Sequence, residues 1–534
     1  MEFIGLSRRG LMTGLAVLGG LPGLARAAAA SSPVVETAGG RVQGFLNASG
    51  VASYLGIPYG ASTGGANRFM PPKPAASWAG VRETVAYGPS APQVTTDGPQ
   101  LPDAPAGPAM NEDCLVLNVW TPSPQRGSGR AVMVWLHGGG FSTGSGSGAA
   151  TNGANLAAIG DVVVVSINHR LNAFGYSYLG RIGGADFADS GNVGQLDIIQ
   201  ALQWVRDNIE AFGGDPSRVT IFGNSGGGSK VETIMAMPSG KGLFHRAIAQ
   251  SGNGYLMAEA DLQDQAARAL MTALGLARGD VRALQAVPQA ALLKAYNDVS
   301  GAVRGPRFSR TFSPTVDGRS LPSHPFAKGA PAVSAGIPAI IGYNHHEVLW
   351  FRRDLKDMSF EEALSDLRGT VGDAADAAVA AYRAARPDLS AREILILVSS
   401  DYQFGAFQRQ IAATRADAGG APTYFYRFDW ETNVGRLRAA HTMEIPFVFS
   451  TLQARRAIVG TTPGQEALAQ KMTVMWANFA KTGRAAAEGW PGWRPYNTAS
   501  RPTMLLNNTI EMVNDPDRPL RIASDRVMGL WPVA

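Results

Sequence analysis

Two patterns of hydrophobic residues alternate along most of the chain. Residues 130–137 (RAVMVWLH) and 161–170 (DVVVVSINHR) are almost unbroken apolar runs, which predict strands buried on both faces. Residues 192–214 instead repeat apolar side chains at helical spacing, so that they share one stripe. This segment predicts an amphipathic helix that ends at Gly213.

The same two patterns continue to the end of the chain. After a strand-like, turn-rich part over about 34–125, apolar runs alternate with helical segments. The further predicted strands lie at 218–223, at 244–252, within 337–347, where the strand runs into a polar loop, and at 422–430. The further helical regions are 258–298, 358–418, which opens with a capping box of Ser359 and Glu362, and 464–483. Such alternation predicts an α/β fold with a large, mostly parallel central sheet.

A glycine-rich turn lies at 223–228, between a predicted strand and a predicted helix. A phosphate-binding P-loop would need Lys and then Ser or Thr after Gly228, but the sequence there is SKV. A second glycine cluster at 137–144 (HGGGFSTG) has a threonine where a dinucleotide-binding fingerprint needs its last glycine. Neither turn therefore predicts a nucleotide site.

The first turn does match G-x-S-x-G, the nucleophile elbow that holds a serine on a strained strand-to-helix corner. The serine is Ser225, and an acid and a histidine follow it in the chain. Glu347 and His441 each come just after a predicted strand, where open α/β sheets place their ligands. The HGGGF loop at 137–141 offers backbone N–H groups for an oxyanion. Together these residues predict nucleophilic catalysis by a serine.

Some polar residues compete for these roles. Glu444 and Asp429 are rival acids because both lie close to His441 in the sequence. Residues 345–347 (HHE) suggest a metal cluster, but adjacent side chains rarely converge on one ion and H-E-x-x-H is absent. We therefore expect no metal and no organic cofactor.

Long, ordered matches make the chain resemble the type-B carboxylesterase (cholinesterase-like) family of α/β-hydrolases. They include GIPYG, NEDCLVLNVW, VWLHGGGF, GNVGQLDIIQALQWVRDNIEAFGGDPSRVTIFGNSGG, AIAQSG, GYNHHE and HTMEIPFVF. The resemblance implies an α/β-hydrolase fold with a single catalytic domain over 31–534. It also implies helical insertions at about 255–335 and 350–420, which form a pocket over the C-terminal ends of the strands.

Carried over position by position, the resemblance implies a serine esterase that acts through an acyl-enzyme. Ser225 would attack the ester carbonyl, His441 would take its proton, and Glu347 would orient the imidazole. The oxyanion would be bound by the N–H groups of Gly139, Gly140 and Gly226. Ser251 and Glu444 match positions that support the triad from behind.

The chain departs from the family pattern in three places. Asn224 and Gly226 replace the usual Glu and Ala on either side of the nucleophile. Ala91 stands where the family has the disulfide partner of Cys114, the single cysteine, which we therefore assign to packing. The carboxylate lost at 224 leads to the hypothesis that the site favours anionic or polar acyl groups over cationic alcohols.

Charge and composition argue against a nucleic-acid partner. The net charge is +5 over 534 residues, the first 27 residues supply +2 of it, and no basic run is interleaved with aromatic residues. Residues 7–12 (SRRGLM) resemble a twin-arginine export signal, followed by an apolar run and an A-x-A site at 25–27. We therefore expect residues 1–30 to be cleaved and the protein to be periplasmic or secreted, without a stable membrane anchor.

The sequence thus predicts a serine carboxylic-ester hydrolase that acts on a small-molecule ester, as a monomer by default. One alternative is an esterase for polycarboxylate esters of the fumonisin type, and another is a non-catalytic cholinesterase-like binding protein. A hydrolase of amides or lactones would use the same machinery. Trp350 and Phe351 are weak candidates for the pocket wall. Arg352 and Arg353 could meet an anionic substrate, although a solvated surface pair is the expectation.

Overall fold

The structure is a computed structural model that describes residues 30–94, 109–303, 310–353 and 355–529. The predicted export signal lies outside these residues, apart from Ala30. From Ala30 onward the chain joins the edge of the main sheet, because the Ala30 carbonyl oxygen accepts the Leu46 N–H at 2.7 Å. Ser31 then forms a β-bridge with Phe45.

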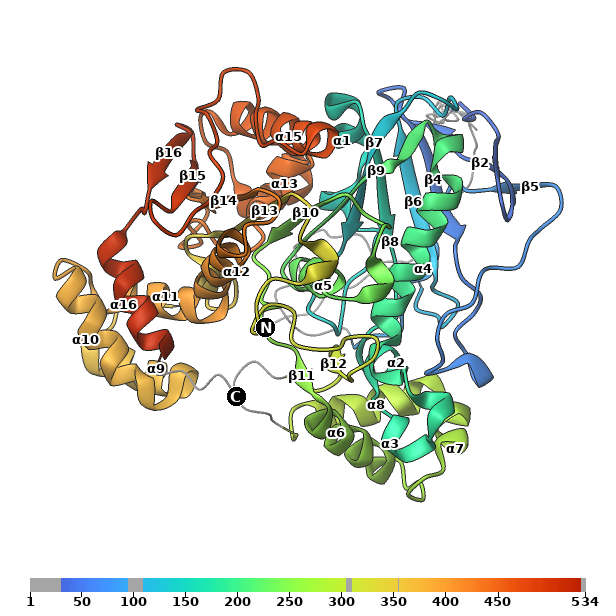
Figure 1. Ribbon diagram of the computed structural model, residues 1–534, viewed down its shortest axis with the longest axis horizontal. Helices are drawn as coiled ribbons and strands as arrows, with labels where there is room; N and C mark the ends of the chain where they lie inside the picture. Colours follow the sequence, from blue (N-terminus) through green and yellow to red (C-terminus); the bar gives the residue numbers. More distant parts are fainter. Residues whose placement is uncertain (1–29, 95–108, 304–309, 354, 530–534) are drawn as a thin grey trace, which may run out of the picture.

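An eleven-stranded sheet runs through the centre of the molecule (Figure 1). Its strands, in spatial order, are β16 (Glu511–Asn514), β15 (Pro502–Leu506), β14 (Thr423–Phe428), β13 (Ala339–Asn344), β10 (Arg246–Gln250), β9 (Gly214–Asn224), β7 (Arg130–Leu136), β8 (Val163–Ile167), β6 (Val116–Thr121), β4 (Ala52–Pro58) and β3 (Phe45–Leu46). The neighbours from β15 to β8 pair in parallel, whereas the strands at both edges are antiparallel. The predicted mostly parallel sheet is therefore confirmed.

The central strands are buried because alternate side chains enter two separate cores. In β7, Val132 and Val134 pack into one core, whereas Met133 and Trp135 pack into the other. All four are at most 1% exposed. A strand that buries both faces needs apolar residues at every position, which explains the unbroken run in the sequence.

Helices cover both faces of the sheet. On one face lies α4 (Val193–Asn208), which a 3-10 turn extends to Gly213, where a left-handed φ of 82° ends it as predicted. On the other face α1 (Ala154–Gly160) packs against α15 (Gln465–Thr482), the predicted late helix. The shorter helices are α2 (Asn172–Tyr176), α3 (Gly180–Gly183), α13 (Ile445–Val448) and α14 (Arg456–Val459).

The first predicted insertion is less continuous than expected. Instead of one helical region over 258–298, it contains α6 (Ala260–Ala273), α7 (Val281–Ala286) and α8 (Gln289–Ser300). Gly275, with φ 67°, follows the end of α6, and Pro288 precedes α8. Up to residue 335 the described chain is mostly turns, with the short strand β12 (Thr315–Val316) paired to β11 (Ala258–Glu259).

The predicted helical region over 358–418 is indeed helical. It contains α9 (Phe360–Val371), α10 (Ala375–Ala385), α11 (Ala391–Ser400) and α12 (Ala406–Asp417). The capping box of Ser359 and Glu362 is present at the start of α9. A small separate sheet near the N-terminus consists of β1 (Val35–Thr37), β2 (Gly40–Gln43) and β5 (Val81–Glu83).

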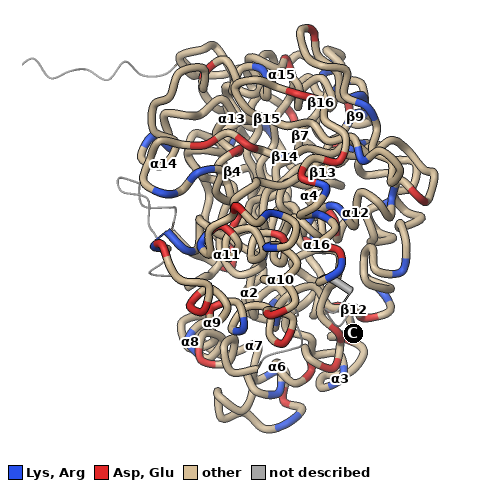
Figure 2. The backbone as a smooth tube through the Cα atoms, turned by 90° about the vertical axis from the view of Figure 1, so that its left-hand side faces the viewer, with Lys and Arg blue, Asp and Glu red and all other residues tan. Residues whose placement is uncertain are grey.

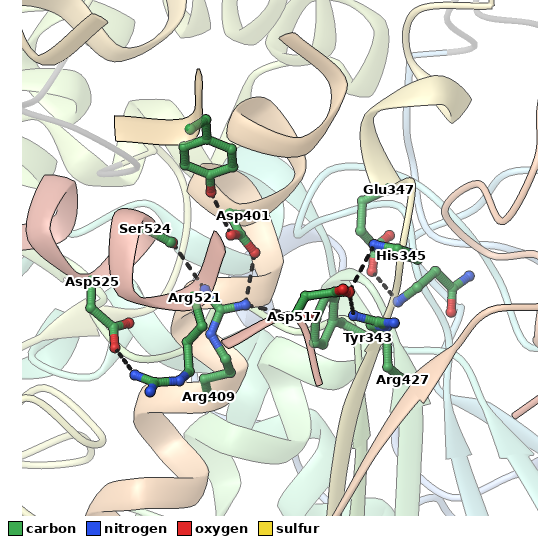
Figure 3. Close-up of polar contacts among 12 residues, drawn as sticks. Tyr343, His345, Glu347, Asp401, Arg409, Arg427, Asp517, Arg521, Ser524 and Asp525 are labelled. Carbon is green, nitrogen blue, oxygen red and sulfur yellow. Dashed lines mark hydrogen bonds and ion pairs between the residues drawn. The ribbon is translucent and has the colours of Figure 1, made fainter. Parts of the chain in front are cut away.

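The C-terminal helix α16 (Arg518–Gly529) is tied to the sheet and to the second insertion by polar contacts (Figure 3). Arg427 of β14 pairs with Asp517 at 2.6 Å, just before the helix begins. Arg409 of α12 lies between Asp401 and Ser524, with nitrogen–oxygen distances of 2.8 and 2.9 Å. These contacts fix the end of the chain beside the strands that lead into the site.

Acidic and basic residues are interspersed along the tube in Figure 2. Among the helices of the described residues, none combines the length and the apolar character needed to cross a bilayer.

Candidate active site

The turn at Ser225 has the strained geometry that the elbow motif predicts. Ser225 joins β9 to α5 (Gly226–Ile234) with φ 60° and ψ −126°, which L-residues rarely adopt. Its N–H donates to the Gln250 carbonyl oxygen of β10 at 2.9 Å. A Cβ atom on Gly227 would stand 2.0 Å from the Leu136 carbonyl oxygen, so that position needs glycine. The corner therefore presents Ser225 at the carboxyl ends of the central strands.

The three predicted oxyanion glycines meet at this corner. Gly139 and Gly140 follow β7 with φ values of 89° and 62°, and Gly226 begins α5. A Cβ atom on Gly226 would stand 2.2 Å from the Gly140 carbonyl oxygen, so loop and helix touch. Within the described residues, none of these three N–H groups donates to a protein acceptor. Unused backbone donors beside a serine are what an oxyanion hole requires.

His441 and Glu347 form the other half of the site. Glu347 begins a 3-10 turn soon after β13, and His441 lies in the loop after β14. Nδ1 of His441 makes a short hydrogen bond with Oε2 of Glu347, and both side chains are buried. The other Glu347 oxygen accepts the Asn344 N–H at 2.8 Å. Nε2 of His441 has no partner among the described residues, and His441 lines the same cavity as Ser225.

Glu444, one of the rival acids, is buried, and its carboxylate is already occupied by hydrogen bonds. Its carboxylate accepts hydrogen bonds from three side-chain amides, those of Asn224 at 2.6 Å, Gln250 at 2.9 Å and Asn344 at 2.7 Å. Burial, and then the charge of Glu347, raises the pKa of Glu444. The side chain of Asn224 is thus a donor to a buried carboxylate, and its own oxygen has no partner among the described residues.

Lys230, which the motifs did not single out, holds the oxyanion loop. It is fully buried on α5, and its ammonium donates to the carbonyl oxygens of His137 and Gly140, each at 2.9 Å. These acceptors bracket the oxyanion glycines. Burial lowers the pKa of Lys230 to about 7, and burial together with the lysine charge lowers the pKa of His137 to about 3. In the sequence, the only hint of this role is that a lysine stands among small residues five positions after the serine.

A cavity of about 1580 Å³ opens over the site. Trp350 and Phe351 line it, as the sequence suggested, and Phe351 is 53% exposed. Phe404, which the sequence did not point to, stacks on the His441 ring with centroids 4.5 Å apart. Phe404 comes from a π-helical turn between α11 and α12, so the second insertion contributes to the wall of the pocket.

The three remaining charged candidates contact other residues of the protein. Asp429, the second rival acid, pairs with Arg427 at 2.6 Å. Arg352 pairs with Asp366 at 2.7 Å, and the guanidinium of Arg353 lies 4.1 Å from the ring centre of Trp350. The ion pairs account for the charges of Asp429 and Arg352 without a substrate.

The other residues singled out from the sequence are Ser251, Cys114 and the adjacent histidines His345 and His346. The Ser251 N–H donates to Gly342 of β13 at 2.8 Å, while its buried hydroxyl bonds no described residue. Cys114 is buried, which raises the pKa of its thiol. His345 lies 3.9 Å from Asp517 (Figure 3), and the described residues contain no group of side chains that could hold a metal.

This arrangement suits covalent catalysis by a serine, because the nucleophile, a histidine held by a carboxylate, and free oxyanion donors surround one cavity. Fold and site together define an α/β serine hydrolase. Comparison with known proteins narrows the class. Residues 31–519 match the carboxylesterase family.

Individual relatives match over nearly their whole length. The chain is 35% identical to the para-nitrobenzyl esterase of Bacillus subtilis (strain 168), covering 91% of this chain and 97% of that one. It is 32% identical to the phenmedipham hydrolase of Pseudarthrobacter oxydans, covering 91% and 98%. A solved carboxylesterase from Geobacillus stearothermophilus aligns with a TM-score of 0.80 at 35% identity, covering 92% and 99%. The chain therefore belongs to the carboxylesterase family.

Membership confirms three predictions from the sequence. The chain has the α/β-hydrolase fold, it is of the type-B carboxylesterase family, and it is a carboxylic-ester hydrolase. The family acts on small-molecule esters.

Proposed function

We propose that Ser225, His441 and Glu347 are the catalytic triad of this esterase and that it works through an acyl-enzyme. The observation that carries the proposal is a strained serine that shares one cavity with a histidine, which a buried glutamate holds through Nδ1. With Nδ1 fixed in this way, Nε2 is the nitrogen that exchanges a proton with substrate.

The reaction proceeds in two steps, acylation of Ser225 and hydrolysis of the acyl-enzyme. Ser225 Oγ bonds to the ester carbonyl carbon while His441 takes its proton, and the oxyanion binds the N–H groups of the three glycines. The tetrahedral intermediate collapses, and the alcohol leaves with the proton from His441. Water then attacks the acyl-enzyme, gives a proton to His441, and releases the carboxylic acid as Ser225 regains its proton.

A fluorophosphonate probe and a panel of neutral esters test these roles. The probe should label wild type but not Ser225→Ala. The kcat of Ser225→Ala for a neutral ester should be about 10⁴- to 10⁶-fold lower than that of wild type. Glu347→Gln should keep labelling but react more slowly, because the imidazole loses its orienting carboxylate. Equal turnover by wild type and Ser225→Ala would refute the triad. A wild type that neither labels nor turns over any ester would favour the non-catalytic binding protein.

Esters that carry carboxylates are the second candidate class of substrate. The cavity supports this candidate, since none of the described residues that line it is Asp or Glu. The polycarboxylate alternative thus rests on the charge of the pocket rather than on Asn224 alone. The remaining alternative is a hydrolase that acts mainly on amides or lactones. A panel of amides and lactones, compared with the esters, tests it.

We also propose that the protein is exported to the periplasm or beyond and acts there as a monomer. The support is the twin-arginine-type signal in residues 1–30, with its A-x-A site. Sedimentation of the purified protein tests the monomer, and a stable dimer would overturn it.

A further inference from the structure

Among the described residues, cationic but not anionic side chains line the cavity over Ser225. Arg310, Arg455 and Arg456 line it, and none of its other described lining residues is Asp or Glu. The buried carboxylates of Glu347 and Glu444 do not line the cavity, and they already accept hydrogen bonds from His441 and from three amides, respectively. Three positive charges therefore face the space in which the substrate binds.

Arg310 is the arginine that lies beside the oxyanion loop. Its Nη1 stands 3.3 Å from the place where a Cβ atom on Gly140 would be. Its carbonyl oxygen is fixed by Gln263 at 3.0 Å and by Ser313 at 2.6 Å. The backbone is thus held in place while the guanidinium reaches towards the catalytic centre.

The guanidinium of Arg310 has donors to spare. Within the described residues, no side chain or carbonyl forms an ion pair or hydrogen bond with it. It is accessible to the water of the cavity, yet the surrounding protein desolvates it enough to lower its pKa. Five N–H donors in a rigid fork are suited to a carboxylate.

Arg455 adds to this field from another wall. It ends the 3-10 turn Leu452–Arg455, which packs against the turn Ala149–Thr151 at the far end of the glycine-rich loop. Burial, and then Arg353, lowers the pKa of Arg455 to about 10. Basic residues are visible next to α14 in Figure 2.

We propose that Arg310 is an anion-binding residue of the active site and that the enzyme prefers esters bearing a second, ionised carboxylate. This inference rests on the proposed function, because the carboxylate is placed relative to an ester bound at Ser225. Because Nη1 of Arg310 comes so close to Gly140, a carboxylate that binds it should lie only a few bonds from the scissile carbonyl. A succinyl group has this spacing.

The test compares charged esters with neutral isosteres. Benzyl hydrogen succinate and benzyl succinamate differ only in an acid or amide on the acyl side. 3-(Butyryloxymethyl)benzoate and its benzamide differ likewise on the alcohol side. Benzyl alcohol or the hydroxymethyl product is measured by chromatography. Wild type should show a kcat/KM at least tenfold higher for the acid of one pair.

Arg310→Gln should remove that preference by lowering kcat/KM for the acid about 10- to 100-fold, the usual loss for a charge-assisted hydrogen bond. The neutral ester should change less than threefold, which also shows that the variant folds. Arg310→Lys should keep part of the preference. Arg278→Gln, an exposed arginine away from the cavity, is the matched control for net charge and should behave as wild type.

The outcomes separate this inference from the proposed function. If wild type hydrolyses the neutral esters but does not prefer either acid, the anion site is wrong while the triad stands. A preference that survives in Arg310→Gln would also overturn it. Failure of all four esters in wild type, together with no labelling by the fluorophosphonate, would instead count against the proposed function.

Discussion

Lys230 places an ammonium ion in the interior with two carbonyl oxygens as its acceptors. Among the described residues no carboxylate forms an ion pair with it. Taking an unpaired charge out of water costs several kcal/mol, and hydrogen bonds to neutral acceptors offset this in part. The stability of the protein should therefore depend on the protonation of this one side chain.

The sign of this dependence follows from the pKa shift. Burial lowers the pKa of Lys230 to about 7, whereas an unfolded lysine titrates near ~10.4. The cost of the buried charge is present below pH 7 and is relieved as the pH rises from about 7 towards ~10.4, since the unfolded chain then binds the extra proton. Relative to Lys230→Met, wild type should gain up to about 1.4 kcal/mol per pH unit in that window.

Urea unfolding of both proteins at pH 6, 7.5 and 9 measures this difference. Lys241→Met removes an exposed lysine and should show a constant difference from wild type at all three pH values. A constant difference for Lys230→Met as well would mean that Lys230 keeps an ordinary pKa.

Asn224 has a defined partner in the structure, the buried carboxylate of Glu444. Its amide donates to Glu444, so a glutamate at this position would set two carboxylates against each other. One of the two would then have to hold a proton. The amide removes that conflict and keeps one negative charge out of the cavity, which agrees with the arginines on its walls.

Among the elements, the glycine loop after β7 and helix α5 are packed more closely than the family sequence allows. The resemblance gives alanine at position 226, yet a Cβ atom on Gly226 would stand 2.2 Å from the Gly140 carbonyl oxygen. The same oxygen accepts the Lys230 ammonium at 2.9 Å. Gly226 thus allows the loop to come this close to α5, and the Lys230 ammonium then holds it there.

Restoring the alanine should harm this enzyme. Gly226→Ala pushes the loop away from Ser225, so that kcat should fall at least tenfold, because removing one oxyanion donor typically costs about 10²- to 10³-fold. KM for a neutral ester should change less than threefold. Gly369→Ala, on α9 with open space around its Cβ position, is the matched control and should leave kcat unchanged.

The coupling between the two positions is measured by a double-mutant cycle. With Lys230→Met the loop is no longer held and can accommodate the alanine, so the double variant should lose less than the product of the single losses. Purely multiplicative effects on kcat, or full activity of Gly226→Ala, would contradict the coupling.

In the whole molecule, sequence patterns predict what depends on local periodicity and on fixed motifs. The unbroken apolar runs predict the parallel strands. Ser225 and Glu347 lie just beyond two of these strands, and His441 lies in the loop that follows β14. The patterns do not predict contacts between distant segments. Arg310 approaches Gly140 from an insertion 170 residues later in the chain, and Phe404 reaches His441 from a π-helical turn. Neither residue has a sequence signal, because its role depends on how the insertions pack over the sheet.

Removal of the predicted export signal should not affect the folded enzyme. Ala30 is hydrogen-bonded to the sheet edge and Ser31 is bridged to it, so cleavage before Ala30 leaves these contacts intact, and cleavage after Ala30 removes only its bond to Leu46. None of the described residues that line the cavity precedes Tyr87 in the sequence, so the signal itself contributes no residue from the described part of the chain. Processed and unprocessed protein should therefore have equal kcat/KM.

Cell fractionation and mass spectrometry of the N-terminus test the prediction. Wild type produced in bacteria should be recovered outside the cytoplasm, starting between residues 28 and 31. The variant Arg8→Lys with Arg9→Lys should stay inside, uncleaved but fully active, because a twin-arginine signal is read through its arginine pair. Arg26→Lys changes an arginine outside that pair and should still be exported. Export of the double variant, or a wild type that keeps residue 1, would refute the signal.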